Sequence, residues 1–176
     1  MEAAWSLFSL HPWTETAAWL AILAAVSAFV NFVVKRALVE ASSRILAGLN
    51  GAAREFGGSS VIPRLANAGP ALVVSAWIMS VPGLPESAAL VVRNVSNAFI
   101  ILCVAMAGAA GADLFDRLWH RKAGPTGRSV RGYVQVGKIL LYGIAAILMV
   151  AAVLDRSPMI LLSGLGAMAA VLILVF

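Results

Sequence analysis

The sequence predicts an all-α integral membrane protein with five transmembrane helices. Apolar residues make up 61% of its 176 residues and charged residues only 12%, and the mean hydropathy is +0.93. These values lie outside the range of soluble globular domains. A membrane-spanning helix needs about 20 predominantly apolar residues, and the chain contains five charge-free windows of roughly that length.

The first window runs from Thr16 to Val34 and is followed directly by two basic residues. The second runs from Leu65 to Pro85 and contains Pro70 and Pro82. Proline ends or kinks a helix because it lacks an N–H and clashes with the preceding turn. We therefore expect a shorter ordered helix between these two prolines.

The third window spans Asn94 to Ala112 and follows an arginine. The fourth spans Ile139 to Leu154 after a polar lead-in, and the fifth runs from Ser157 to Phe176. The fifth is still apolar at its last residue, and a helix end within hydrocarbon leaves four carbonyl groups unpaired. We therefore expect the chain to be the membrane part of a longer protein. The predicted divisions are three N-terminal helices in 1–112 with a basic linker at 35–64, a basic loop at 113–133, a fourth helix in 134–156, and the start of a fifth in 157–176.

Ten of the thirteen Lys and Arg residues fall in two connections, one between the first two windows and one between the third and fourth. The positive-inside rule places both connections in the cytoplasm, the N-terminus outside, and the end of the fifth helix towards the cytoplasm. The residues predicted to set topology or to contact lipid headgroups are Lys35, Arg36, Arg121, Lys122, Arg128 and Arg131. The basic residues are not interleaved with stacking aromatic residues, so we expect no nucleic-acid partner.

Catalytic and metal-binding patterns are weak. Asp113, Asp116 and His120 follow a helical spacing of i, i+3 and i+7, and two carboxylates with a histidine occur at metal and acid–base sites. They stand among basic residues at the end of the third window, so a solvated, self-paired helix end is the simpler interpretation. Cys103 is the single cysteine, which excludes an internal disulfide. No ionisable residue lies deep in any window, so we predict no enzyme, no cofactor and no metal site.

Small residues are concentrated in two windows. The third ends with small-xxx-small pairs at Ala107/Gly111 and Gly108/Ala112, which let helices approach closely. In the fifth, one stripe is small and another is bulky: Ser163, Gly166, Ala167 and Ala170 form the first, and Leu161, Leu165, Met168 and Leu172 the second. Such a face fits either ordinary packing inside a bundle or a ring of identical helices around a symmetry axis.

Three segments carry a resemblance to a known family: Arg128–Lys138 (RSVRGYVQVGK), Asp155–Pro158 (DRSP) and Leu161–Ala167 (LLSGLGA). Together with the apolar fourth window they resemble the small-conductance mechanosensitive channel (MscS-like) family, and more narrowly its five-helix YbdG-type branch. The resemblance is specific over residues 128–176, and the helix count and orientation extend it loosely over the rest of the chain.

The resemblance implies a homoheptameric ion channel of the bacterial inner membrane that opens under membrane tension during hypo-osmotic stress. Its pore is lined by the last membrane helix, its N-terminal helices sense tension in contact with lipid, and its cytoplasmic β-domain is absent from this sequence. The register places Leu174 and Ala170 at the two rings that constrict the pore. Leucine is common at both rings, so Ala170 departs from the pattern. Gly166, Ala167 and Ala169 match the positions over which neighbouring pore helices slide, and Ser163 continues their small face.

Two other classes of function stay open. A non-conducting assembly or scaffold subunit would use the same small-residue helices for association alone. A fragment of a secondary transporter is disfavoured, because such proteins carry polar groups near the bilayer midplane and repeated, broken spans in two halves.

Overall fold

The computed structural model describes residues 12–34, 36–37, 40, 60–123 and 131–176. All the elements it describes are helices, and five segments are long and apolar enough to cross a membrane. These results confirm the predicted all-α class and the predicted number of helices that are long and apolar enough to span a membrane. The spans are Thr14–Val33, Val61–Ser80, Glu86–His120, Arg131–Val153 and Pro158–Val175.

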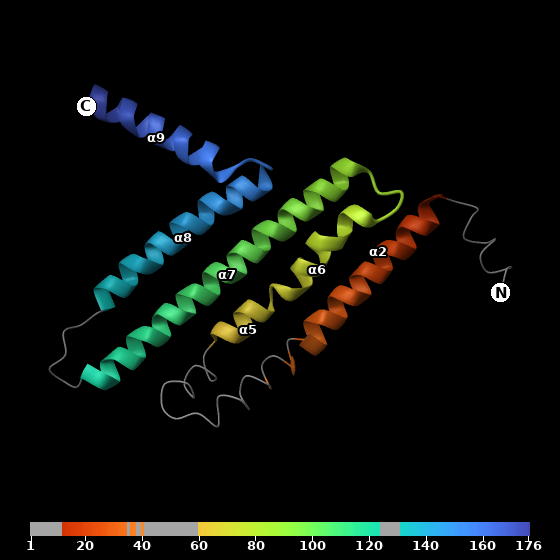
Figure 1. Cartoon of the computed structure of the whole chain (residues 1–176), viewed down its shortest axis with the longest axis horizontal. Coiled ribbons are helices and arrows are strands. Elements are labelled where there is room, and N and C mark those ends of the chain that lie inside the picture. Colours follow the sequence, from red (N-terminus) through yellow and green to blue (C-terminus); the bar gives the residue numbers. More distant parts are fainter. Residues whose placement is uncertain (1–11, 35, 38–39, 41–59, 124–130) are drawn as a thin grey trace.

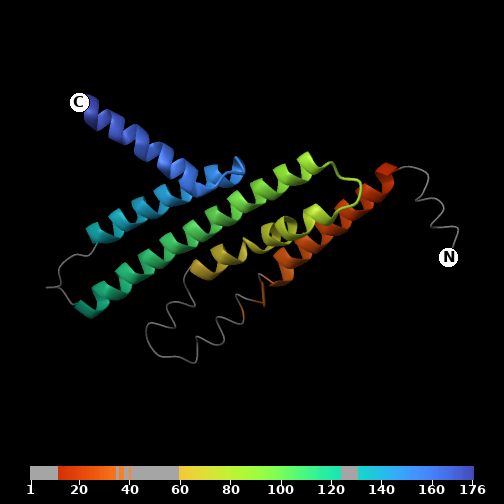
Figure 2. The same ribbon diagram turned by 45° about the horizontal axis from the view of Figure 1, so that its top comes forward.

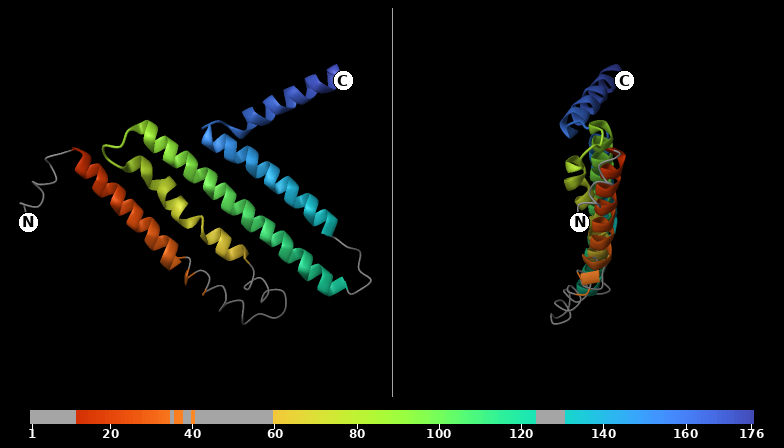
Figure 3. Two further views of the ribbon diagram at one scale, coloured as in Figure 1. Left: turned by 180° about the vertical axis from the view of Figure 1, so that it is seen from behind. Right: turned by 90° about the vertical axis from the view of Figure 1, so that its right-hand side faces the viewer.

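The first four spans lie side by side in a nearly flat layer, and neighbours in the layer are neighbours in the sequence (Figure 1, Figure 2). In the right-hand view of Figure 3, the layer is seen edge-on and its four spans overlap in a narrow column. The layer is therefore about one helix thick. The last helix leaves the layer at an angle (Figure 1). The elements are α2 (Pro12–Phe29), the π-helix η1 (Val30–Val34), α5 (Val61–Ala66), α6 (Gly69–Trp77), the 3₁₀-helix η2 (Ile78–Ser80), α7 (Glu86–Ala123), α8 (Arg131–Val153) and α9 (Pro158–Val175).

Prolines divide the second span as the sequence predicted. Pro70 lies in the first turn of α6, where its missing N–H costs no helical hydrogen bond. The helix ends before Pro82, and the chain is extended at Val81. The sequence did not predict α5, a short helix that precedes α6 and packs with it against α7.

The break between α5 and α6 faces the irregular end of the first span. A Cβ at Gly69 would lie 3.2 Å from Val30 Cγ1, at the start of η1, so a side chain there would crowd the contact. One turn away, Ser27 Oγ donates a hydrogen bond to the Pro70 carbonyl oxygen at 3.4 Å. The π-helix at the end of the first span and the break in the second span therefore lie in contact with each other.

The third helix is longer than the window Asn94–Ala112 predicted. α7 has 38 residues and continues to Ala123, which places the first part of the predicted loop 113–133 inside the helix. At 1.5 Å per residue it is about 57 Å long, compared with about 30 Å for the hydrocarbon core of a bilayer. A charge-free window marks the part of a helix that suits hydrocarbon, whereas charged residues such as Asp113 and Arg117 continue the same helix into the polar region. α8 begins at Arg131, so residues 131–133 of the predicted loop also lie in a helix.

Small side chains let α7 pack closely on both sides. Cys103 is fully buried, as are four alanines of the predicted small-residue segment: Ala105, Ala107, Ala109 and Ala110. A Cβ at Gly108 would lie 3.0 Å from Leu141 Cδ2 of α8, so the glycine admits this side chain. The close approach predicted from small residues in the third window is thus present within the chain.

A Schellman motif ends α8 and turns the chain towards α9. The Arg156 N–H donates to the Ala151 carbonyl oxygen at 3.0 Å, and the Asp155 N–H donates to that of Ala152 at 3.3 Å. Asp155 has a φ of 51° in this motif, a left-handed conformation that glycine, asparagine and aspartate tolerate best. Ser157 is extended, and Pro158 begins α9.

Candidate functional site

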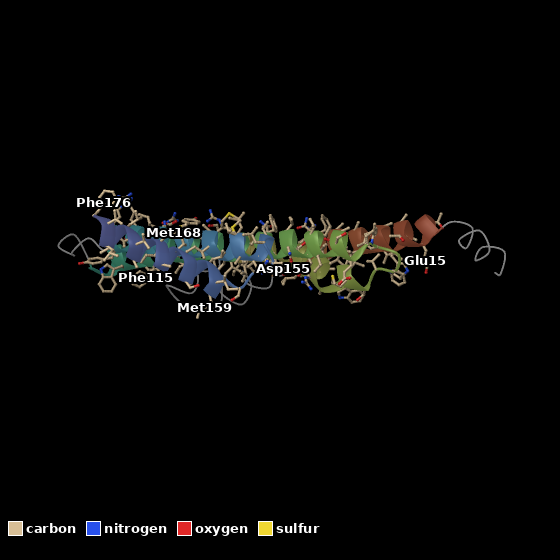
Figure 4. All side chains as sticks on the ribbon, turned by 90° about the horizontal axis from the view of Figure 1, so that it is seen from above. Glu15, Phe115, Asp155, Met159, Met168 and Phe176 are labelled. Carbon is tan, nitrogen blue, oxygen red and sulfur yellow. The ribbon has the colours of Figure 1, made fainter. Side chains whose placement is uncertain are left out.

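The predicted pore residues all lie on α9, and α9 is the least covered helix of the described structure. None of its residues is buried. Met159 and Phe176 lie at opposite ends of it in Figure 4, with exposures of 74% and 101%. Its contacts with the layer run to α8, next to the turn that joins them. An apolar helix of this kind needs lipid or other helices around it.

Four of the predicted residues share one face of α9. At about 100° per residue, Ser163, Ala167 and Ala170 lie within about 40° of Leu174 around the helix axis. The Leu174 side chain is 87% exposed, and the three small residues are exposed as well. Gly166 lies at the border of this face, about 80° from Leu174, and Ala169 lies about 140° away. We call Ser163, Ala167, Ala170 and Leu174 the small face of α9.

The two glycines of α9 face open space, as Gly111 of α7 and three glycines of α8 also do. A Cβ added at Gly164 or Gly166 would meet no atom within 4 Å, whereas Gly69 and Gly108 each face a side chain of a neighbouring helix at 3.2 and 3.0 Å. Glycine inside a helix costs about 1 kcal/mol relative to alanine. Packing within the described chain accounts for Gly69 and Gly108, but it accounts neither for the two glycines of α9 nor for the four open glycines of α7 and α8.

The predicted basic residues gather at one end of the layer. The C-terminal end of α7 and the N-terminal end of α8 lie there together, along with the start of α5 (Figure 1). Arg121 and Lys122 belong to the last turn of α7, Arg131 begins α8, and Arg36 is exposed. Lys35 and Arg128 lie outside the described residues.

The acidic residues at the same end of the layer form two separate pairs. Asp116 and His120 lie one turn apart on α7, with Nδ1 of the histidine 3.2 Å from Oδ1 of the carboxylate. Asp113 instead forms an ion pair with Lys138 of α8. The predicted self-pairing of the helix end therefore holds for Asp116 and His120, while Asp113 joins two helices. Among the described residues, no three His, Cys, Asp or Glu side chains are placed to hold a metal ion.

A cavity of about 540 Å³ lies between the charged ends of α7 and α8. The sequence alone did not predict this cavity, although Arg131, Gln135 and Lys138 follow the i, i+4, i+7 spacing of one helical face. The sequence does not show that this face of α8 lies opposite Asp113, Asp116 and Arg117 of α7. The lining residues are Asp113, Asp116, Arg117, Arg131, Val134, Gln135 and Lys138.

Two polar contacts within the layer were also missed. Ser75 Oγ of α6 donates a hydrogen bond to Asn97 Oδ1 of α7 at 2.5 Å. Arg64 of α5 donates from Nη1 to the Met106 carbonyl oxygen at 3.0 Å, and thereby reaches a residue inside the third span. Both contacts tie the broken second span to α7.

No family model matches this chain, and neither a curated protein nor a solved structure matches it. The relation to mechanosensitive channels drawn from residues 128–176 therefore stays a prediction.

Proposed function

We propose that this chain is a subunit of a tension-gated ion channel of the MscS-like kind, in which copies of α9 surround a pore. The observation that carries the proposal is the exposure of the apolar helix α9. It is apolar along its length, it has no buried residue, and its glycines face open space. A helix with a small face and nothing packed on it suits close contact with copies of itself.

The layer of four spans supports this arrangement. Its helices alternate in direction (Figure 1), and ten of the thirteen Lys and Arg residues fall in the connections between its first two and its last two spans. With these connections in the cytoplasm, as the positive-inside rule requires, α9 starts from the outer side. The layer would surround the ring of α9 helices and contact lipid, and the membrane would be the bacterial inner membrane.

Leu174 is the proposed gate residue. A ring of apolar side chains in a narrow pore expels water and denies ions their hydration, so it blocks conduction without a charged plug. Membrane tension favours the state of larger in-plane area and shifts the equilibrium towards the open pore. Ala170 lies one turn before Leu174 on the small face and would give a wider second ring.

The test compares two serine substitutions two residues apart. Leu174→Ser should hydrate the constriction and lower the tension at which channels open in patch recordings from liposomes that contain the intact protein. Leu172→Ser is the matched control, because Leu172 is also exposed but lies about 160° away around the helix. Its opening tension should match that of the unsubstituted protein.

Two results would contradict the proposal. If the unsubstituted protein assembled but carried no tension-dependent current, a non-conducting scaffold would be the better interpretation. If both serine variants opened at the original tension, Leu174 would not be the gate.

A further inference from the structure

The cavity between α7 and α8 lies where their apolar stretches end. Its α7 residues follow directly after the charge-free window that ends at Ala112, and its α8 residues precede the window that begins at Ile139. In a membrane-inserted chain this border coincides with the lipid headgroups, which lie just outside the hydrocarbon core. A volume of about 540 Å³ falls within the range of small-molecule sites.

Two arginines line this cavity with unused hydrogen-bond donors. Arg117 and Arg131 are exposed, and neither has an ion pair or hydrogen bond within the described part of the chain. Lys138 differs, because Asp113 already pairs with it. Arg131 also begins α8, where the free N–H groups of the first turn favour an anion. Guanidinium groups bind phosphate oxygens through parallel hydrogen bonds.

One carboxylate in the cavity pairs with no Lys or Arg of the described residues and lies beside His120. Asp116 Oδ1 is buried and accepts no hydrogen bond from the described residues, so a ligand in the cavity would meet the exposed part of this carboxylate and not Oδ1 itself. The nearby His120 Nδ1 lies closer to the Asp116 backbone carbonyl oxygen, at 2.8 Å, and its N–H is directed there. The Asp116 side chain is only 22% exposed, so its charge is partly removed from water. A cation in the cavity would stabilise this charge.

We propose that this cavity binds the headgroup of a phospholipid that carries a primary ammonium, as in phosphatidylethanolamine. Arg117 and Arg131 hold the phosphodiester, and Asp116 receives the ammonium. Gln135 offers an amide to the remaining oxygens of the headgroup. The site goes beyond the proposed function, since it requires membrane insertion of α7 and α8 but not conduction.

The test is lipid retention measured by native mass spectrometry. Protein purified in detergent is mixed with equal amounts of phosphatidylethanolamine, phosphatidylglycerol and phosphatidylcholine, and the lipid that stays bound is identified. We expect phosphatidylethanolamine to be preferred, because the other two lack an N–H donor. Asp116→Asn should abolish this preference, and the double substitution Arg117→Gln/Arg131→Gln should lower retention about tenfold or more.

Arg156→Gln is the matched control, because it removes one exposed arginine at the other end of α8. It should leave both retention and preference unchanged. An Asp116→Asn variant that keeps the preference would overturn the ammonium assignment. Undiminished retention in the double variant would overturn the phosphate assignment.

A second measurement needs no substitution. Amide hydrogen exchange over 113–117 and 131–135 should be slower in nanodiscs that contain phosphatidylethanolamine than in nanodiscs of phosphatidylglycerol, and equal rates would count against the site. Soluble glycerophosphoethanolamine in tenfold excess should leave the lipid bound. Displacement by the soluble compound would show that the site takes a free headgroup, and the lipid assignment would fail.

Discussion

Arg93 Nη2 of α7 lies 3.9 Å from Asp155 Oδ1, in the turn between α8 and α9. This ion pair connects the start of α9 to a helix that is not its neighbour in the sequence. Both side chains are partly exposed, 33% for Arg93 and 62% for Asp155, so the pair contributes well under about 1 kcal/mol to stability. The ion pair affects where the turn lies. The left-handed backbone of Asp155 affects the turn more strongly than this ion pair does.

Substitutions at Asp155 should separate the backbone from the charge. Asp155→Val should lower the free energy of unfolding by about 1–2 kcal/mol, because a β-branched residue is strained at a φ of 51°. Asp155→Gly should be neutral or stabilising by up to about 1 kcal/mol, since glycine adopts this conformation freely. Thermal unfolding in detergent, followed by circular dichroism, measures both. Equal stability of the valine and glycine variants would argue against the left-handed turn.

Alanine should stabilise the protein much more at one glycine of α7 than at another. Gly111→Ala should stabilise the protein by about 1 kcal/mol, because nothing lies within 4 Å of the added Cβ and alanine favours helix. Gly108→Ala should lose most of this gain, since Leu141 Cδ2 lies 3.0 Å from the new Cβ. Gly108→Val should be destabilised by about 1–3 kcal/mol through overpacking.

Unfolding by denaturant in the same detergent compares these glycine variants, and Leu141→Ala should rescue Gly108→Val. If Gly108→Ala and Gly111→Ala were stabilised equally, this result would contradict the close contact between α7 and α8 at Gly108.

The hydrogen bond between Ser75 and Asn97 should appear in a double-mutant cycle. Hydrogen bonds between transmembrane helices contribute about 0.6 kcal/mol on average. Ser75→Ala and Asn97→Ala should therefore be non-additive by about this amount when unfolding free energies are compared. Ser96→Ala is a control on α7 that lies next to Asn97, and with Ser75→Ala it should be additive. If the coupling free energy between Ser75 and Asn97 were zero, the hydrogen bond between the two side chains would be contradicted.

A bulky residue on α9 should act on assembly without acting on the fold of one subunit. Gly166→Leu adds a side chain where the described chain leaves open space, so helicity and unfolding of the subunit should be unchanged or improved. Native mass spectrometry should nevertheless show fewer or smaller oligomers, because the small residues of α9 can no longer approach a second copy. Gly137→Leu on α8 also meets open space and serves as the control. Unchanged oligomers in the Gly166 variant would contradict close packing at this position.

The spans could be predicted because hydrocarbon imposes a simple requirement on composition. Runs without charge located all five, and Pro70 and Pro82 located the ends of the ordered helix between them. The i, i+4 spacing of Asp116 and His120 predicted their pairing because both residues lie on one helix. Each of these features depends on residues that are close in the sequence.

Features that join different helices could not be predicted in this way. One sequence does not say that Lys138 meets Asp113, or that Arg64 meets the Met106 carbonyl group. The extension of α7 to Ala123 was missed for another reason. Hydropathy reports where a helix suits lipid, and a helix continues into water as long as no breaker stops it. The cavity combines both difficulties, since it requires the extended α7 and its pairing with α8.

The order of the helices in the layer also bears on biogenesis. Each span in the layer packs on the one made just before it, so in a membrane-inserted chain every new helix would find its main partner already in the bilayer as it leaves the ribosome. Loops between such neighbours close at small entropic cost. α9 follows α8 but meets little of the described chain, so lipid or other helices must cover its apolar surface after it is made.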